Sequence, residues 1–360
     1  MRGGRTAVAQ LLAAAVRAGL APGAVAAWVR VGESAPSAVA TGTADLGPPP
    51  LPAAADTVFD LASLTKPLAT TTLVLLARRE GRLDLDTRVG RLLPELADRP
   101  LGERSVLELL THSSGLPAWA PLYALCRGRR KRLTAALGEL PLAPAGRQVV
   151  YSCPGFITLG LGLESLYGRA LDRLFGEAVA APLGLGIGFG PRPGDGVAAG
   201  ARVPGAERRL VAERGLDEAW IPATGPGLPD DGNARFLGGA AGNAGLFGRA
   251  LEVLTLASVY LPGGGLLTDE ERALATGNHT PGHGQARGLG WQLASSPGCS
   301  AGPSLAPEAF GHTGFTGTSL WLDPTRRLVA VLLTNRTHPG HNEVDPHPLR
   351  RRFHDLLVRA

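Results

Sequence analysis

Lysine is almost absent from this chain. Only two of its 36 basic residues are lysines, Lys66 and Lys131, and the others are arginines. Lys131 lies in the basic run RGRRKR, where an arginine would be solvated equally well. Lys66 lies between apolar neighbours in the stretch FDLASLTKPLAT. Because a lysine ammonium taken out of water can lose its proton whereas a guanidinium cannot, this position indicates that an amine is needed.

Long apolar runs and paired cysteines are also missing. The chain has no run of about 18 apolar residues, so no membrane-spanning helix is predicted. Cys126, Cys153 and Cys299 are odd in number and show no CxxC spacing, which favours a reducing compartment without structural disulfides or zinc. Residues 1–23 have apolar residues at helical spacing, which favours an amphipathic helix over a signal peptide. We therefore expect a cytoplasmic protein.

The net charge of +5 is a weak guide to binding partners. Arginine is enriched along the whole chain, and its side chains are scattered rather than interleaved with aromatic residues. Nucleic-acid-binding surfaces concentrate basic residues on one face, so no nucleic-acid partner is expected.

Strand patterns occur at both ends of the chain, and helical patterns occur between them. The strand patterns lie in residues 23–47, 288–294 and 319–335, the last as a hairpin that turns at Asp323-Pro324. Helical spacing recurs in residues 66–81, 104–117, 155–179, 244–261 and 349–360. Residues 184–235 are rich in Gly, Pro and charge, which is typical of long surface loops.

This order of elements predicts a single domain of mixed α/β (α+β) class. One antiparallel sheet would be built from both chain termini, residues 1–62 and 280–360, and flanked by helices. The mainly helical part, residues 63–279, would form an all-helical subdomain inserted between them.

Ser63 and Lys66 are three residues apart, a spacing that puts both on one face of a helix. If Ser63 opens that helix, the amine of Lys66 can reach the serine oxygen, as nucleophilic catalysis requires. Pro67 is compatible with a first helical turn, where backbone N–H groups have no partner. Ser-x-x-Lys arises by chance about once in a chain of this length, so a surface serine with a solvated lysine is the alternative. The scarcity of lysine counts against that alternative.

Two further stretches complete a known pattern. RQVVYSCPGFITLG places Tyr151 before a predicted helix, and FGHTGFTGTSLWLDP places His312 before a predicted strand. A serine with a lysine, a Tyr-Ser-X turn and a His-Thr-Gly strand, in this order, resemble the serine β-lactamase and penicillin-binding protein superfamily. The resemblance extends over nearly the whole chain and is closest to the branch of class C β-lactamases, esterases and D-alanyl-D-alanine carboxypeptidases. It implies a β-lactamase/transpeptidase-like fold.

The resemblance also implies which residues carry the chemistry. Ser63 would be the acylated nucleophile, and Lys66 with Tyr151 would transfer its proton. A serine hydroxyl needs an adjacent base with a lowered pKa, which a desolvated lysine beside a tyrosine can supply. For Tyr151 the alternative is a core tyrosine whose hydroxyl is hydrogen-bonded elsewhere.

The same resemblance places the substrate along the His-Thr-Gly strand. The backbone N–H groups of Ser63 and Phe315 would form the oxyanion hole, and His312, Thr313 and Gly314 would contact the substrate. Cys153 stands where members that act on peptides or β-lactams commonly have an asparagine whose amide binds the substrate's acylamino group. A thiol is a poor hydrogen-bond partner, so this recognition should be weakened.

His312 is a second departure from the family pattern, because it replaces a frequent lysine and removes a permanent positive charge. With Cys153, it favours an esterase or a peptidase of unusual substrate over an efficient β-lactamase.

Three other features are weaker signals. The stretch THPGHNEVDPHP contains potential metal ligands, namely His338, His341, Glu343, Asp345 and His347. Its proline-broken spacing defines no common face, so no metal site is predicted. We interpret His112 as structural, and Asn243 either as bordering the active-site cleft or as capping the following helix.

The leading hypothesis is a serine hydrolase that forms an acyl-enzyme on Ser63 and cleaves a small-molecule ester, amide or peptide without a cofactor. Two alternatives remain open. The chain could be a penicillin-binding-type protein that binds or senses a ligand without turnover, or an acyltransferase that uses the same site.

Overall fold

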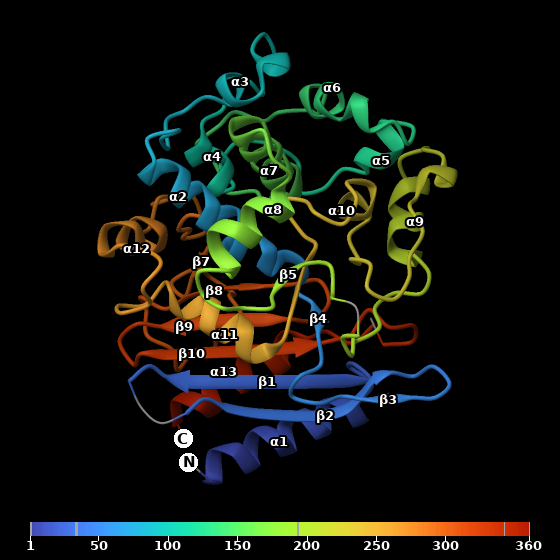
Figure 1. Ribbon diagram of the computed structural model, residues 1–360, viewed down its shortest axis with the longest axis vertical. Helices are drawn as coiled ribbons and strands as arrows, with labels where there is room; N and C mark the ends of the chain where they lie inside the picture. The colour runs from blue at the N-terminus through green and yellow to red at the C-terminus, as the bar shows by residue number, and fades with distance from the viewer. Residues whose placement is uncertain (1, 33–34, 193, 342, 360) are drawn as a thin grey trace.

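The computed structural model describes residues 2–32, 35–192, 194–341 and 343–359. An antiparallel sheet lies across the middle of the molecule, with most helices on one side of it (Figure 1). Helices α1 (Arg2–Arg17) and α13 (His347–Arg359) lie on the other side and contact each other. The sheet is thus the middle layer of three.

The central sheet joins strands from the two ends of the chain. Within the described residues it has seven strands in the order β3-β2-β1-β10-β9-β8-β7. Their bounds are β1 Gly23–Arg30, β2 Ser37–Asp45, β3 Leu51–Pro52, β7 Gln292–Leu293, β8 Phe310–Thr313, β9 Ser319–Asp323 and β10 Leu328–Thr334. β1 pairs antiparallel with β10, from Ala24 opposite Thr334 to Arg30 opposite Leu328. The predicted sheet built from both termini is confirmed.

Both faces of the central strands are buried. On β1, Val25 and Ala27 belong to the large apolar core shared with the helical part, whereas Ala24 and Ala26 face the core formed with α1 and α13. Residues of β10 alternate in the same way, because successive side chains of a strand point to opposite faces. A strand buried on both faces needs no polar alternation, which explains the continuous apolar run in β10.

The remaining helices lie mostly on the side of the sheet opposite α1 and α13 (Figure 1). Their bounds are α2 Thr72–Arg79, α3 Val89–Leu92, α4 Val106–Leu110, α5 Leu122–Leu125, α6 Leu133–Gly138, α7 Cys153–Tyr167, α8 Leu171–Phe175, α9 Gly205–Ala212, α10 Gly232–Phe236, α11 Ala250–Ser258 and α12 Asp269–Thr276. Short 3-10 turns span Ala62–Leu64, Pro94–Leu96, Arg130–Arg132 and Glu218–Trp220, and π-helical turns span Lys66–Thr71 and Gly176–Ala180. α11 packs directly on β1 and β10.

Three sequence-based boundaries were wrong. The helix predicted over residues 155–179 is two helices, because Gly168 adopts a left-handed φ of +61° that ends α7. The segment 184–235 is not all loop, since it contains strand β5 (Gly188–Phe189) and helices α9 and α10. Short helices such as these depend on tertiary contacts, here including an ion pair between Arg235 and Glu207.

The third error leads to the candidate site. The helix predicted over residues 244–261 begins only at Ala250, and Leu246–Gly248 instead forms strand β6. β6 is the middle strand of a small sheet, between β4 (Phe59–Asp60) and β5. Ser63 follows β4 by three residues, so this sheet places the segment around residue 246 beside the serine turn.

None of the described helices is long and apolar enough to cross a membrane. The division of the chain into residues 1–62, 63–279 and 280–360 stays a prediction.

Candidate active site

Ser63 lies in a tight turn between strand β4 and helix α2. It belongs to the 3-10 turn Ala62–Leu64, and the chain continues through the π-helical turn Lys66–Thr71. Thr65 ties this turn to β6, because its Oγ1 donates to the carbonyl of Ala62 at 2.7 Å and accepts from the N–H of Leu246 at 3.1 Å. The helical geometry expected around Ser63 is present, although its first turns are 3-10 and π rather than α.

Lys66 is completely buried, with 0% of its surface exposed. Its Nζ donates hydrogen bonds to Ser63 Oγ at 2.9 Å and to the carbonyl oxygen of Asn243 at 2.9 Å. The same Nζ lies 4.9 Å from the centre of the Tyr151 ring. The alternative of a solvated lysine is therefore wrong, and the structure brings Ser63, Lys66 and Tyr151 together.

The charge of Lys66 depends on its acidic neighbours. Burial lowers its pKa, but the anionic forms of Cys153 and Tyr151 raise it, and the balance lies above the ordinary value. Burial in turn raises the pKa of both Tyr151 and Cys153, so neither is an anion near neutral pH. The lowered lysine pKa expected from the sequence is therefore not found, because Cys153, Tyr151 and the charge of Asp231 more than offset the effect of burial.

The Tyr-Ser-Cys motif precedes helix α7 because Ser152 caps that helix. Ser152 Oγ accepts from the N–H of Gly155 at 3.2 Å and donates to the carbonyl of Pro117 at 2.8 Å. The N–H of Ser152 donates to His112 Nδ1 at 3.0 Å, and the His112 ring packs against Tyr151 with centroids 4.6 Å apart. His112 thus has the structural role expected of it, supporting the Tyr151 turn. Tyr151 is only partly buried and lines a pocket, which contradicts the core-tyrosine alternative.

His312 lies near the end of strand β8 and is a neutral imidazole. Its Nδ1 lies 2.8 Å from the carbonyl oxygen of Thr313 and donates to it, which leaves Nε2 as an acceptor without a partner among the described residues. Burial and the charges of Lys66 and Arg287 hold the pKa of His312 well below its usual range. The neutral state expected of His312 at pH 7 agrees with this environment.

The turn after β8 packs tightly against the serine turn. A Cβ on Gly314 would lie 2.1 Å from Thr318 Oγ1 and 2.9 Å from the carbonyl of Leu61, so only glycine fits there. Phe315 follows at the pocket edge, and no partner of its N–H is found within the described part of the chain. A free N–H at this point can donate a hydrogen bond to a developing oxyanion.

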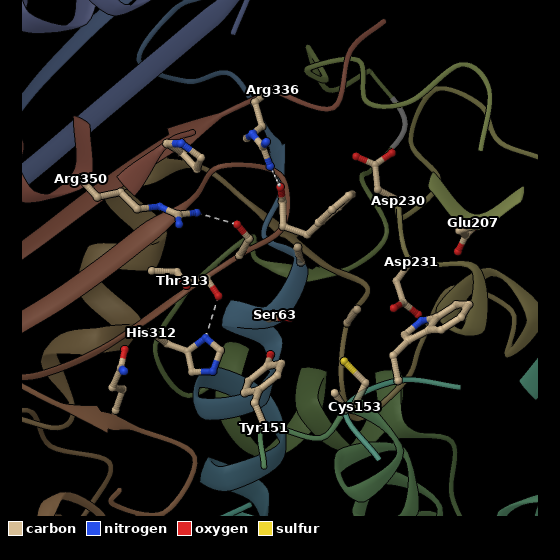
Figure 2. A pocket seen from close by; sticks show the side chains of 18 of the residues that line it. Ser63, Tyr151, Cys153, Glu207, Asp230, Asp231, His312, Thr313, Arg336 and Arg350 are labelled. Atoms are coloured by element: carbon tan, nitrogen blue, oxygen red, sulfur yellow. Dashed lines mark hydrogen bonds between the residues drawn. The ribbon is translucent and has the colours of Figure 1, made fainter. Parts of the chain in front are cut away.

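Two arginines hold the carbonyl groups of this turn. Arg350, on α13, donates to the carbonyl of Gly314 at 2.8 Å, and Arg336 donates to that of Phe315 at 3.2 Å (Figure 2). Arg350 also donates to the carbonyl of Thr318 at 3.0 Å. The carbonyl of Gly314 and the N–H of Phe315 belong to the same peptide group. Because Arg350 holds the carbonyl, the direction of the Phe315 N–H is also defined.

These elements enclose a pocket of about 640 Å³. Its lining includes every predicted site residue except the buried Lys66, namely Ser63, Tyr151, Cys153, His312, Thr313, Gly314 and Phe315. In Figure 2, Arg350 and His312 lie to one side of Ser63, Arg336 lies above it, and Glu207, Asp230 and Asp231 lie to the other side. The pocket is therefore polarised, with cations near the His-Thr-Gly strand and carboxylates on the opposite wall.

Arg287 is a pocket residue that the sequence argument missed. Its side chain is 6% exposed and lies 6.0 Å from the Tyr151 ring centre. One of its amino groups donates to Gln285 Oε1 at 2.6 Å, and no carboxylate contributes to its pKa, which burial lowers to about 10. His312 is itself neutral, as expected, but Arg287 supplies the pocket with a positive charge from another position. Nothing in the motif around Arg287 distinguishes it from the many other arginines.

The weaker sequence signals also have clear positions. The carbonyl of Asn243 binds Lys66 and its buried side-chain amide has no described partner, so Asn243 borders the site rather than capping α11, whose N-cap is Arg249. His338 lies 3.7 Å from Asp45, and His341 Nδ1 lies 3.2 Å from the carbonyl of Gly19. Within the described ranges, no three His, Cys, Asp or Glu side chains are grouped as metal ligands would be.

Known proteins are similar to this chain in sequence and in fold. The sequence profile described as Beta-lactamase matches residues 8–354. A protein of Escherichia coli K12, described as a candidate D-alanyl-D-alanine carboxypeptidase, is 30% identical over 318 residues, which cover 80% of this chain and 71% of the relative.

Solved structures show the same fold. SurE is 26% identical, with a TM-score of 0.67 over 92% of this chain and 72% of its own. A penicillin-binding protein homologue from Caulobacter crescentus is 22% identical, with a TM-score of 0.75 over 99% of this chain and 97% of its own. The fold is thus the β-lactamase and penicillin-binding protein fold that the motifs implied. With the profile match over nearly its whole length, this chain belongs to the β-lactamase family and is a serine hydrolase of that family.

Proposed function

We propose that the chain cleaves an ester or amide through an acyl-enzyme on Ser63. The observation that carries this proposal is the position of Lys66 Nζ, 2.9 Å from Ser63 Oγ in a fully buried setting. An amine in contact with the hydroxyl can accept its proton during attack, and Tyr151 beside it can pass that proton to the leaving group. The N–H groups of Ser63 and Phe315 then bind the oxyanion.

Covalent labelling tests this proposal directly. A fluorophosphonate probe or a penicillin should add to Ser63, as detected by mass spectrometry of the digested protein, and Ser63→Ala should remain unlabelled. An unlabelled wild-type protein with both probes would refute the acyl-enzyme. Labelling by penicillin without turnover of any ester or peptide would favour the ligand-binding alternative, and an amine-dependent product would favour acyl transfer.

We further propose that the substrate's leaving group carries a carboxylate. Arg287 supports this idea, because it is a buried cation on the pocket wall with no carboxylate partner among the residues that the structure describes. Such a guanidinium is stabilised by a substrate carboxylate that forms a charge-assisted hydrogen bond with it. The description of the Escherichia coli relative as a candidate carboxypeptidase is consistent with this substrate class. The acyl group of the substrate would face Cys153 and would be recognised by apolar contacts with pocket residues such as Trp119 and Leu210.

Arg287→Met should therefore discriminate between two matched substrates. A depsipeptide that ends in a free D-lactate carboxylate should lose about 10- to 150-fold in kcat/KM, because one charge-assisted hydrogen bond contributes about 1.5 to 3 kcal/mol. The methyl ester of the same depsipeptide has no carboxylate, so its kcat/KM should change far less. Equal losses on both compounds would show that Arg287 supports the fold of the site and does not bind the leaving group.

The cytoplasmic location expected from the unpaired cysteines stays a proposal, consistent with three free thiols in the structure.

A further inference from the structure

Asp60 connects the three segments that surround the nucleophile. It ends strand β4, three residues before Ser63, and only 7% of its surface is exposed. Its Oδ1 accepts from the N–H of Ala62 at 2.8 Å, and its Oδ2 accepts from the N–H of Asp230 at 2.8 Å. Its carbonyl oxygen accepts from Thr316 Oγ1 at 2.9 Å. Asp60 thus joins the serine turn, the acidic wall of the pocket and the turn that presents Phe315.

The bond to Ala62 matters because Ala62 is in a strained conformation. Its φ of +48° lies in the left-handed region, which costs a residue with a Cβ about 1 kcal/mol or more. Strain of this kind persists only where surrounding contacts stabilise it, and the carboxylate of Asp60 supplies one to the strained peptide itself. Relaxation of Ala62 would displace Ser63, the next residue, from Lys66.

We propose that Asp60 is a positioning residue whose ionised carboxylate holds the Ser63 turn in its reactive geometry, so that protonation of Asp60 switches the site off. This inference rests on the proposed function, since it assumes that Ser63 is the nucleophile. A carboxylate offers an acceptor to both N–H groups at once. A protonated carboxyl carries hydrogen on one oxygen, so one of the two N–H groups then faces a neutral hydroxyl, which is a weaker acceptor than a carboxylate oxygen.

The surroundings of Asp60 place this change near neutral pH. Burial and the neighbouring acids Asp230 and Asp231 raise its pKa to about 7, although the N–H groups of Asp230 and Ala62 oppose the shift. Asp230 is itself partly buried, and desolvation raises its pKa, while Thr337, Ala201 and Arg235 lower it in part. No basic group is among the main influences on Asp60.

The direction of the pH effect follows from these groups. Activity should rise with pH through about 7 as Asp60 ionises. Folding stability should change in the opposite sense. Asp60 of the folded chain retains a proton that the unfolded chain releases at the ordinary aspartate pKa of 3.8. The contribution of Asp60 to the free energy of unfolding is therefore fully present below that pH and is lost as pH rises through about 7.

Asp60→Asn tests the proposal through the pH profile of kcat/KM for p-nitrophenyl acetate and of the rate of fluorophosphonate labelling at Ser63. Asparagine keeps one acceptor and cannot ionise. At pH 8 the variant should be about 10- to 100-fold slower than wild type, as expected for a displaced nucleophile, and the difference should largely vanish at pH 5.5. Adding Ala62→Gly should recover part of the loss, because glycine adopts a positive φ without strain.

Asp230→Asn provides a second test that keeps Asp60 in place. Removing the neighbouring charge should lower the pKa of Asp60, so the acid limb of the profile should move to lower pH. Glu207→Gln is the matched control, because Glu207 is another pocket carboxyl whose burial raises its pKa to about 7, yet it does not contact Asp60. Its variant should retain the limb at its wild-type position.

The proposal would be overturned if kcat/KM of Asp60→Asn still fell at acid pH as it does in the wild type, or if the variant lost activity equally at every pH. The proposal would also be overturned if the fall of kcat/KM at acid pH disappeared in Glu207→Gln, or if it did not move to lower pH in Asp230→Asn. Failure of the wild-type protein to label at Ser63 would instead refute the proposed function, which keeps the two outcomes separate.

Discussion

Lys66→Arg should slow acylation of Ser63 by about 10²- to 10⁴-fold, the range typical of a lost general base. A guanidinium retains its proton at any pH at which the protein is folded, so it cannot accept the proton of Ser63 Oγ. The rate of p-nitrophenyl ester hydrolysis and the rate of fluorophosphonate labelling should fall together. Thermal unfolding of the variant would show whether the buried site accommodates the larger head group.

The chain provides a matched control, because its other lysine is exposed. Lys131→Arg, in the 3-10 turn Arg130–Arg132, should change neither rate. A comparison with Lys66→Met separates the role of the charge from that of proton transfer, because methionine removes both whereas arginine keeps the charge. If Lys66 served only as a cation, arginine would retain activity and methionine alone would abolish it. Turnover of Lys66→Arg close to wild type would therefore contradict the role of Lys66 as the base.

Wild-type protein should cleave short aryl esters such as p-nitrophenyl butyrate much faster than nitrocefin, and Cys153→Asn should narrow this gap. An amide at position 153 can bind the acylamino group of a β-lactam, whereas a thiol cannot. One such hydrogen bond contributes about 1.5 to 3 kcal/mol, so nitrocefin turnover should rise by about 10- to 150-fold in Cys153→Asn. If Arg287 binds the substrate carboxylate as proposed, the contact missing for a β-lactam is the acylamino contact at position 153.

Cys153→Ala is the control for this gain of activity. It removes the thiol without adding an amide, so nitrocefin turnover should stay low while ester hydrolysis continues. A wild-type protein that hydrolyses nitrocefin as readily as the esters would contradict the role assigned to position 153. So would a comparable gain in Cys153→Ala.

Local patterns were sufficient for the parts of the site that lie close together in the sequence. Ser63 and Lys66 meet because residues three apart on a helical turn share a face, and this holds even though the turn is 3-10 and π rather than α. Tyr151 lies just before α7 because Ser152 is a good N-cap. The hairpin of β9 and β10 followed from two apolar runs separated by a turn.

Contacts between distant segments could not be predicted in this way. Strand β6 was mistaken for the start of a helix, because its three residues form a strand only through pairing with β4 and β5. The second partner of Lys66, the carbonyl of Asn243, comes from the segment that leads into β6. A backbone carbonyl has no sequence signature, so only the fold could identify it.

The sequence by itself therefore determined the family, the sheet built from both termini and the residues of the three motifs, because these depend on local periodicity and on side-chain chemistry. The tertiary structure alone decided the charge of the pocket. Arg287 and Asp60 are ordinary charged residues in the sequence, and their importance arises from burial. A guanidinium with no carboxylate partner among the described residues and a carboxylate beside Asp230 there acquire shifted pKa values that water would otherwise suppress. Burial is a property of the folded chain, so no local pattern could have predicted it.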